Sequence, residues 1–318
     1  MKTYRINPKY SLILKSDNKL LCISSTNNVC YYNVEESEKE NILTILKTEL
    51  FKQQNSKIFH ELLRNKIIIE CDNLSSNRNT KSYLDVYTNL NINMEELSKK
   101  RVFIIGLGGI GCEVITHLVG VGIKQFVILD FDNVDCTNLN RQYLYDNCDI
   151  SKNKVETVTK KIKLKNPSAI VKSYNKFIKN CTEIESIIKK EYIDIVVCAA
   201  DTPFLDIRIF ILKACISCNV PCVFGGVSIL TGQYGPTFLS PRKMNLYLKK
   251  LNKIKKEVEC NNTNKSSFGP TNTIISAYMA IDTIMALLNA QKSINSLNKI
   301  KTLNFITRKD YEEEKFWS

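Results

Sequence analysis

The sequence predicts an α/β protein whose main domain is a doubly wound, mostly parallel sheet, preceded by a small α+β domain with a winged-helix-like layout. Two observations predict the main domain. From residue 101 onwards, short apolar runs alternate with segments of helical periodicity, which indicates crossover units joining parallel strands. The runs VFIIG and DIVVCAA are apolar at every position, as expected of strands covered on both faces. A different pattern before residue 71 predicts the smaller domain.

Length and composition fit a globular protein with ordinary solubility. The chain has 318 residues, of which 44% are hydrophobic and 24% charged, enough for a sizeable core and a smaller domain. No apolar run reaches membrane-spanning length and no signal-peptide pattern is recognisable, so we expect a cytoplasmic protein that does not enter a membrane. The net charge of +13 indicates anionic partners, but no nucleic-acid-binding module is recognisable, so we expect no specific nucleic-acid binding. Twelve scattered cysteines predict reduced thiols.

Residues 1–70 have the pattern of a separate domain. Two apolar runs within 10–24 flank a turn, and 29–34 supplies a third strand. Helical spacing of apolar residues follows in 36–51 and again in 56–70. Three strands followed by two helices fit a winged-helix-like domain.

Residues 71–100 are predicted to be a linker with short helices, and 101–318 to form the main domain. The expected strands are 101–105, 125–130, 169–175, 193–199 and 221–228. The expected helices between them are 109–121, 152–165, 182–190 and 203–218. A basic, asparagine-rich stretch follows, after which Pro270 opens a long apolar helix and 301–307 forms a last strand.

A glycine-rich turn joins the first strand of the main domain to its first helix. Gly106, Gly108 and Gly111 satisfy G-x-G-x-x-G, and Gly109 adds a further glycine. Glycine is required where a backbone turns tightly and approaches phosphate oxygens, and the following helix offers free N–H groups. Asp130 ends the next strand, where a carboxylate can accept hydrogen bonds from ribose hydroxyls. Together these features predict a nucleotide on a Rossmann-like sheet, without selecting which nucleotide.

Three charged residues further along favour a triphosphate. Arg141 lies in the loop beyond the second strand, Lys154 in the first turn of the next helix, and Asp201 at the end of a later strand. Cleavage of a triphosphate requires positive charge on the leaving pyrophosphate and a carboxylate for Mg²⁺. A dinucleotide used for hydride transfer would leave these three residues without a role.

These residues resemble those of the ThiF/MoeB/HesA superfamily of ubiquitin-activating-enzyme-like adenylyltransferases. The likeness rests on GLGGIG, LDFDNVDCTNLNRQ, the lysine of SKNKVET and the aspartate of AADTP, and it covers about residues 101–290. It implies an ATP-dependent adenylyltransferase in which a polypeptide carboxylate displaces pyrophosphate and forms an acyl adenylate. Because a carboxylate is already a nucleophile, no general base is needed, and positioning with charge stabilisation supplies the catalysis.

The resemblance also implies roles for individual residues. Asp130 would hold the ribose of ATP, Arg141 and Lys154 its phosphates, and Asp201 the Mg²⁺ ion. The other nucleotide-binding residues that it implies are Gly106, Gly108, Gly109, Gly111, Asp132, Asn138 and Gln142.

Two departures from the superfamily concern cysteines. Many members hold zinc with two Cys-x-x-Cys pairs, whereas Cys215 and Cys218 form the one such spacing near the expected region, on a predicted helix, so we expect no zinc. Some members carry a catalytic cysteine in the loop that crosses the active site. Cys260 lies in the corresponding stretch, and we interpret it as an incidental loop residue.

The N-terminal domain separates the subfamilies. Sulfur-carrier activators usually begin with a short helix, whereas MccB-like peptide-adenylating enzymes carry a small domain that clamps a precursor peptide, often through a sheet edge. The segment NRNTKSYL resembles one in which those enzymes have an arginine pair, here Arg78 and Lys81. In those enzymes, an arginine of this segment reaches the ATP of the other protomer. The resemblance therefore implies a homodimer and a catalytic role for Arg78. The alternative for Arg78 is a solvated linker residue.

The leading hypothesis is adenylation of a carboxylate of a ribosomal precursor peptide during maturation of a peptide natural product such as an antibiotic. The first alternative is activation of the C-terminal glycine of a ubiquitin-like sulfur-carrier protein. The second is a non-catalytic leader-peptide-binding partner, against which the intact glycine, arginine, lysine and aspartate positions argue. A dinucleotide oxidoreductase is the third.

Overall fold

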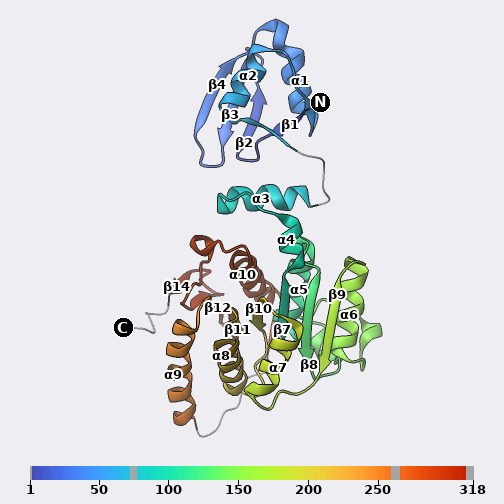
Figure 1. Cartoon of the computed structure of the whole chain (residues 1–318), viewed down its shortest axis with the longest axis vertical. Helices are drawn as coiled ribbons and strands as arrows, with labels where there is room; N and C mark the ends of the chain where they lie inside the picture. The colour runs from blue at the N-terminus through green and yellow to red at the C-terminus, as the bar shows by residue number, and fades with distance from the viewer. Residues whose placement is uncertain (1, 72–76, 259–265, 313–318) are drawn as a thin grey trace. The chain divides into compact units, whose positions relative to one another are not determined.

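A computed structural model describes residues 2–71, 77–258 and 266–312. The chain divides into two compact units, Met1–Ile92 and Asn93–Ser318 (Figure 1). Among the described residues, no helix combines the length and apolar character needed to cross a membrane.

The smaller unit is α+β, with two three-stranded antiparallel sheets and two helices that share one core. The first sheet has the order β2-β3-β4, formed by Tyr10–Leu14, Lys19–Ser24 and Val29–Asn33. The second has the order β5-β1-β6, formed by Phe51–Lys52, Thr3–Ile6 and Ile68–Glu70. The main helices are α1 (Lys39–Lys47), α2 (Lys57–Arg64) and α3 (Arg78–Thr88).

Two expectations for this unit are wrong. The helix predicted over 36–51 ends earlier, because α1 ends at Lys47 and Phe51 begins β5. The helix predicted over 56–70 is too long, because α2 ends at Arg64 and the apolar run after it forms β6. Strand β6 pairs with β1 in the register Arg5↔Ile69, more than 60 residues away in the sequence. A helical periodicity therefore continued by chance into a strand.

The larger unit is built on an eight-stranded sheet of order β14-β13-β12-β11-β10-β7-β8-β9. Its parallel strands are β7 (Arg101–Ile105), β8 (Gln125–Asp130), β9 (Ile170–Asn175), β10 (Ile195–Cys198) and β11 (Cys222–Val227). Antiparallel strands extend one side: β12 (Thr231–Phe238), β13 (Lys301–Asn304) and β14 (Asp310–Glu312). The predicted doubly wound, mostly parallel sheet is confirmed.

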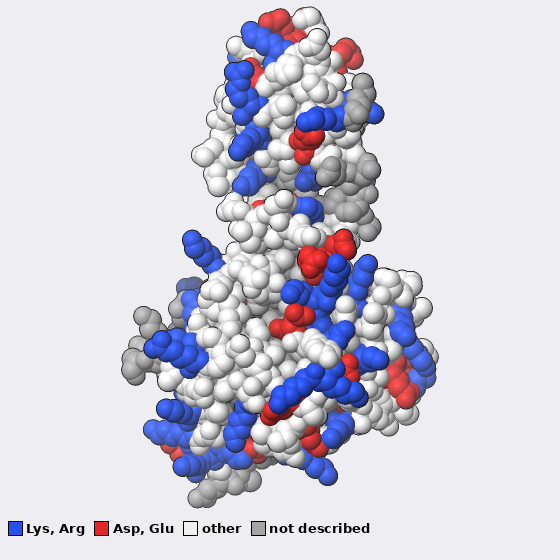
Figure 2. Space-filling view, in the orientation of Figure 1, with Lys and Arg blue, Asp and Glu red and all other residues white. Residues whose placement is uncertain are grey.

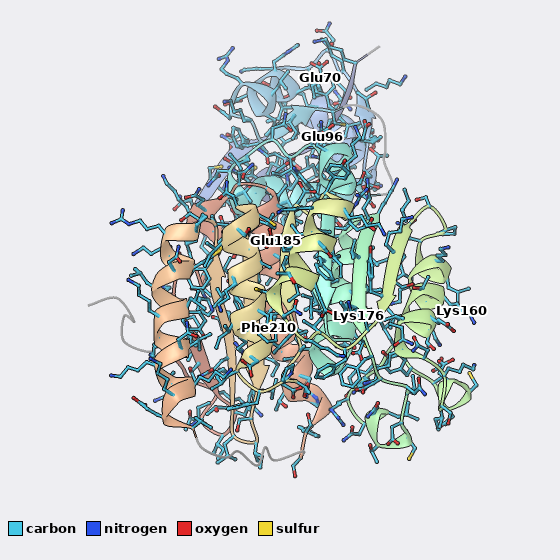
Figure 3. All side chains as sticks on the ribbon, turned by 60° about the horizontal axis from the view of Figure 1, so that its bottom comes forward. Glu70, Glu96, Lys160, Lys176, Glu185 and Phe210 are labelled. Carbon is cyan, nitrogen blue, oxygen red and sulfur yellow. The ribbon has the colours of Figure 1, made fainter. Side chains whose placement is uncertain are left out.

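Helices cover both faces of this sheet. After α4 (Met94–Lys99), one set comprises α5 (Gly109–Val121), α6 (Lys154–Lys165) and α10 (Gly269–Leu287). The other set comprises α7 (Cys181–Glu191), α8 (Asp206–Cys218) and α9 (Pro241–Glu257). Lys and Arg side chains gather where α9 lies (Figure 2), and α7, α8 and α9 lie side by side over one face (Figure 3).

The strand order creates a switch point between β7 and β10. The chain moves outward from β7 through β8 to β9, then returns to β10 on the other side of β7 and continues to β11. The loops that follow β7 and β10 therefore leave the sheet in opposite directions. In doubly wound sheets, ligands bind in the crevice that this divergence creates at the carboxyl ends of the strands.

Candidate functional site

The glycine turn after β7 lies at this switch point. Gly106 has a φ of +94°, and an added Cβ would lie 2.7 Å from the backbone of Ala200, which follows β10, so only glycine fits. An added Cβ at Gly111 would lie 1.9 Å from the carbonyl oxygen of Gly106, so the helix packs closely on the turn. At Gly108 an added Cβ would meet only the Nε2 atom of Gln142, at 3.9 Å. The turn is thus packed at its two ends and open at Gly108.

Asp130 fastens the turn to the end of β8. Its Oδ2 atom accepts a hydrogen bond from the backbone N–H of Leu107 at 2.6 Å, and its Oδ1 atom accepts one from the N–H of Asp132 at 2.8 Å. The residue is buried, with 7% of its surface exposed. Each carboxylate oxygen can accept a further bond. Asp130 therefore shapes the turn and retains acceptor capacity for a ligand hydroxyl.

Tyr145 holds Leu107 through its carbonyl group. The Tyr145 hydroxyl donates to the Leu107 carbonyl oxygen at 2.9 Å, and the Sγ atom of Cys112 lies 3.3 Å from the same oxygen. Burial raises the pKa of Cys112 to about 12 and raises the pKa of Tyr145, so both groups stay protonated as donors at neutral pH. Tyr145 is not among the residues predicted from the sequence. Its only signal is the pair of tyrosines around a leucine in a polar loop, QYLYD.

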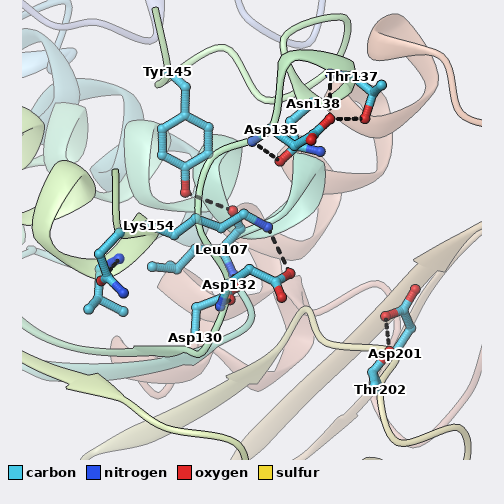
Figure 4. A network of polar contacts seen from close by, with 12 residues as sticks. Leu107, Asp130, Asp132, Asp135, Thr137, Asn138, Tyr145, Lys154, Asp201 and Thr202 are labelled. Carbon is cyan, nitrogen blue, oxygen red and sulfur yellow. Dashed lines mark hydrogen bonds and ion pairs between the residues drawn. The ribbon is translucent and has the colours of Figure 1, made fainter. Parts of the chain in front are cut away.

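The segment after β8 runs antiparallel to the residues that begin α6. Asn133 bridges Asn153, and the backbone N–H of Lys154 donates to the carbonyl oxygen of Asp132 at 3.1 Å. The side chains of the same two residues also pair, with 3.1 Å between Nζ of Lys154 and Oδ2 of Asp132 (Figure 4). The lysine side chain is 6% exposed and the aspartate side chain 49%. A buried cation is therefore held by a carboxylate that faces solvent.

The loop between β8 and α6 orders two further predicted residues by local bonds. The Oδ1 atom of Asn138 accepts from the backbone N–H of Asp135 at 3.2 Å, as part of a capping box. The Nη1 atom of Arg141 donates to the carbonyl oxygen of Thr137 at 3.0 Å and to Oδ1 of Asn140 at 2.9 Å. The Arg141 guanidinium therefore bonds to residues of the same loop.

Gln142 is buried beside the glycine turn. Only 3% of its surface is exposed, and among the described residues its Oε1 atom has no hydrogen-bond partner. A buried acceptor without a partner is costly, so this atom is suited to a ligand donor. Asn272, in the first turn of α10, also reaches this region, because an added Cβ at Gly109 would lie 2.5 Å from its Oδ1 atom. Asn272 follows the FGP signal, but its position was not singled out from the sequence.

Asp201 follows the neighbouring strand, β10. It is exposed, and its Oδ1 atom accepts from the Thr202 hydroxyl at 3.1 Å. Figure 4 shows it apart from the pair of Lys154 and Asp132, at the end of its own strand. No hydrogen bond or ion pair within the described ranges joins Asp201 to that pair. The arrangement leaves a free carboxylate on the other side of the switch point.

The remaining predicted residues lie elsewhere. Arg78 begins α3 in the smaller unit. Cys260 lies outside the described residues. Cys215 is buried and Cys218 half-buried on α8.

One group of possible metal-binding side chains occurs in the described part of the chain. It comprises Asp146, Cys148 and Asp149. Lys161 pairs with both of its carboxylates and Lys152 with one of them, so their charge is already matched. This group therefore does not resemble a thiolate zinc site.

The geometry suits a polyanionic nucleotide. The N-terminus of α5 supplies free N–H groups and the positive end of a helix dipole beside the open face of Gly108. Lys154 adds a cation. The carboxylate of Asp201 is of the type that Mg²⁺ prefers. These residues fit a nucleoside triphosphate with its metal ion.

Comparisons with known proteins agree with this geometry. The ThiF family model matches residues 84–316. A curated relative, the probable molybdopterin-synthase adenylyltransferase of Gracilaria tenuistipitata var. liui, is 31% identical over 205 residues, or 61% of this chain and 53% of the relative. The chain spans about half or less of the length of the curated relatives that it matches.

Solved structures match the chain over nearly its whole length. Escherichia coli MccB with ATP has a TM-score of 0.70 at 22% identity, covering 98% of this chain and 97% of that one. The microcin C7 biosynthetic enzyme MccB with N-formylated MccA has a TM-score of 0.68 at 21% identity, covering 98% and 97%. At these identities the likeness establishes a common fold that includes the smaller unit.

Proposed function

The chain belongs to the ThiF family, and from that premise we propose that it is an ATP-dependent adenylyltransferase. One observation carries the proposal. The glycine turn, the buried Asp130 and the pair of Lys154 and Asp132 meet at one side of the switch point, and Asp201 follows the neighbouring strand, β10. A hydride-transfer site would need the turn and Asp130, but not a buried lysine and a carboxylate across from it.

In this proposal the phosphates of ATP lie against Gly108 and the N-terminus of α5. Asp130 accepts a ribose hydroxyl with its remaining lone pairs. Lys154 exchanges its bond with Asp132 for one with a phosphate oxygen, and Arg141 leaves its loop carbonyl to do the same. The supporting pocket residues are Gly106, Gly109, Gly111, Asp132, Asn138 and Gln142.

The proposed reaction needs charge more than proton transfer. A carboxylate oxygen of a polypeptide attacks the α-phosphorus, a new P–O bond forms, and the bond to the pyrophosphate oxygen breaks. The products are an acyl adenylate and pyrophosphate. Lys154 and Arg141 stabilise the charge that develops on the leaving group. Asp201 would hold Mg²⁺, which supplies further positive charge to the phosphates when bound.

A precursor peptide is the proposed substrate. The support is that MccB, a biosynthetic enzyme of microcin C7 that was solved with N-formylated MccA, shares the fold of both units. The smaller unit would then bind the peptide. A second candidate, activation of a sulfur-carrier protein, is favoured by the relative named as a probable molybdopterin-synthase adenylyltransferase. We also place the protein in the cytoplasm, where ATP is present and thiols stay reduced.

Pyrophosphate exchange into ATP tests the enzyme proposal. We expect exchange that depends on a synthetic peptide or carrier encoded beside the gene. Lys154→Ala and Asp201→Ala should each lower the rate about a hundredfold, the scale for losing a group that stabilises transition-state charge. Lys160→Ala on α6, which is exposed, should leave the rate unchanged. Exchange without any polypeptide, or preference for NAD over Mg·ATP in a binding titration, would overturn the proposal.

A mixing experiment tests the proposed homodimer, in which Arg78 acts on the ATP of the other protomer. Arg78→Ala and Lys154→Ala should each be inactive alone. A mixed dimer contains one site with both residues intact, so random mixing should restore about a quarter of the parent activity. Inactive mixtures of exchanging dimers would show that Arg78 does not act in trans.

A further inference from the structure

Helix α9 presents a row of cations to solvent. Seven of its 17 residues are Lys or Arg, and its only acidic residue is Glu257 at the last position. Figure 2 shows the resulting cluster of basic side chains at the lower left of the larger unit, where Figure 1 draws α9. Helix α9 therefore carries a dense group of cations with almost no acidic residue among them.

Four of these cations form a stripe, which is Arg242, Lys249, Lys253 and Lys256. At about 100° per residue they lie within about 60° of one another around the helix axis. The apolar residues Met244, Tyr247 and Leu251 are buried on the opposite side of the helix. All four stripe residues are exposed, and within 2–71, 77–258 and 266–312 none of them has an ion-pair partner. The stripe is thus not part of an internal charge network.

The stripe runs toward the edge of the sheet that carries the candidate site. Lys255, on the flank of α9, pairs with Asp206, the first residue of α8. Asp206 follows Asp201 by a short turn, so this ion pair places the end of α9 near the carboxyl end of β10. From its first to its last cation the stripe extends about 21 Å at 1.5 Å per residue.

We propose that this stripe binds an acidic segment of a polypeptide in extended conformation. An extended chain rises about 3.3 Å per residue, so about seven residues span the stripe. Acidic side chains at alternate positions of such a chain point the same way, about 6.6 Å apart, which is close to the rise of about 6 Å between Lys249 and Lys253. Single-stranded nucleic acid fits less well, because it needs aromatic platforms between cations, and Tyr247, the aromatic residue of α9, is buried.

The position of the stripe brings a bound polypeptide close to the candidate site. A polypeptide bound along it would have one end near Asp201. If that polypeptide is the substrate, the stripe guides it toward the site of adenylation. This part of the inference rests on the proposed function. Binding itself does not depend on that chemistry.

A direct binding assay on the full chain, without nucleotide, tests the inference. The probe is a fluorescent peptide of about seven residues with glutamate at alternate positions, compared with its glutamine counterpart. Lys249→Glu combined with Lys253→Glu should weaken binding of the glutamate peptide about tenfold, and added salt should weaken it further. The matched control reverses two exposed lysines of α6, Lys160→Glu with Lys163→Glu, and should change the affinity less than twofold.

Three results would overturn the inference. The first is no binding of the glutamate peptide to the parent chain. The second is equal loss in both double variants, which would mean that only net charge matters. The third is a single-stranded oligonucleotide that binds more tightly than the peptide and depends on the same two lysines. The binding assay contains no ATP, so its result does not depend on whether the protein adenylates a substrate. The proposed enzyme activity is tested separately, by pyrophosphate exchange.

Discussion

Replacing Asp130 by asparagine tests whether one carboxylate holds the glycine turn. Each of its two oxygens accepts one backbone N–H, from Leu107 at 2.6 Å and from Asp132 at 2.8 Å. Asparagine has nearly the same shape but only one oxygen, so one of the two N–H groups then faces an NH₂ group; the bond from Leu107 is buried and the bond from Asp132 is partly buried. Losing a hydrogen bond to a charged group costs about 1.5–3 kcal/mol, and an unsatisfied buried donor costs about 1–3 kcal/mol. These costs overlap, so we expect a loss of about 3 kcal/mol in the free energy of unfolding.

Urea denaturation followed by circular dichroism measures this loss, and hydrogen exchange of the Leu107 and Asp132 amides locates it. Asp135→Asn is the matched control. Both bonds from Thr137, through its backbone N–H and its hydroxyl, go to the same oxygen of Asp135, so asparagine can keep them. We expect the control to leave stability nearly unchanged, because Asp and Asn cap equally well. Equal stability of the two variants, with unchanged exchange of both amides, would refute the assigned role of Asp130.

Three further predictions follow from the same region. Gly108→Ala should leave stability nearly unchanged but weaken ATP binding at the open face of the turn. Gly106→Ala should destabilise the fold, because Gly106 has a positive φ and an added Cβ would clash with the backbone. Thermal unfolding and ATP titration distinguish the two variants. Tyr145→Phe should cost about 1–2 kcal/mol in urea denaturation, because the Leu107 carbonyl loses its hydroxyl donor. Burial raises the pKa of Glu113 above its ordinary value of 4.5, so the folded state holds this proton more tightly and stability should fall as pH rises through the raised pKa. Glu113→Gln should remove that fall, and parallel urea titrations at about pH 5 and pH 8 would contradict the prediction if parent and variant respond alike.

The regular part of the large sheet could be predicted closely from the sequence. Strands β7 and β8 and helix α5 begin and end at the predicted residues, because buried parallel strands are apolar throughout and glycine marks the turn between strand and helix. Helix α9 was not predicted. Met244, Tyr247 and Leu251 carry a helical spacing, but the many cations around them suggested an irregular basic stretch.

Short strands of the smaller unit could not be predicted for a different reason. Strands β5 and β6 have two and three residues, and both pair with β1, which lies far away in the sequence. Their stability comes from this distant partner, so no local pattern identifies them.

The candidate site also contains residues that could be predicted from the sequence and residues that could not. Asp130 and Asp201 could be placed because parallel strands bring their carboxyl ends to one edge of the sheet. The contact of Tyr145 with Leu107 and the approach of Asn272 depend on the path of loops, which the sequence pattern does not specify.

The pairing of Lys154 with Asp132 has a consequence for which anions the protein retains. Any ligand that recruits this lysine must compete with a tethered carboxylate 3.1 Å away. A monovalent anion offers no more charge than that carboxylate and lacks the entropic advantage of the tether. A ligand with several negative charges can engage the lysine, the helix terminus and Arg141 together. The tethered carboxylate of Asp132 thus selects for ligands with several negative charges. Chloride or acetate should compete poorly for Lys154, whereas a polyphosphate should displace the carboxylate.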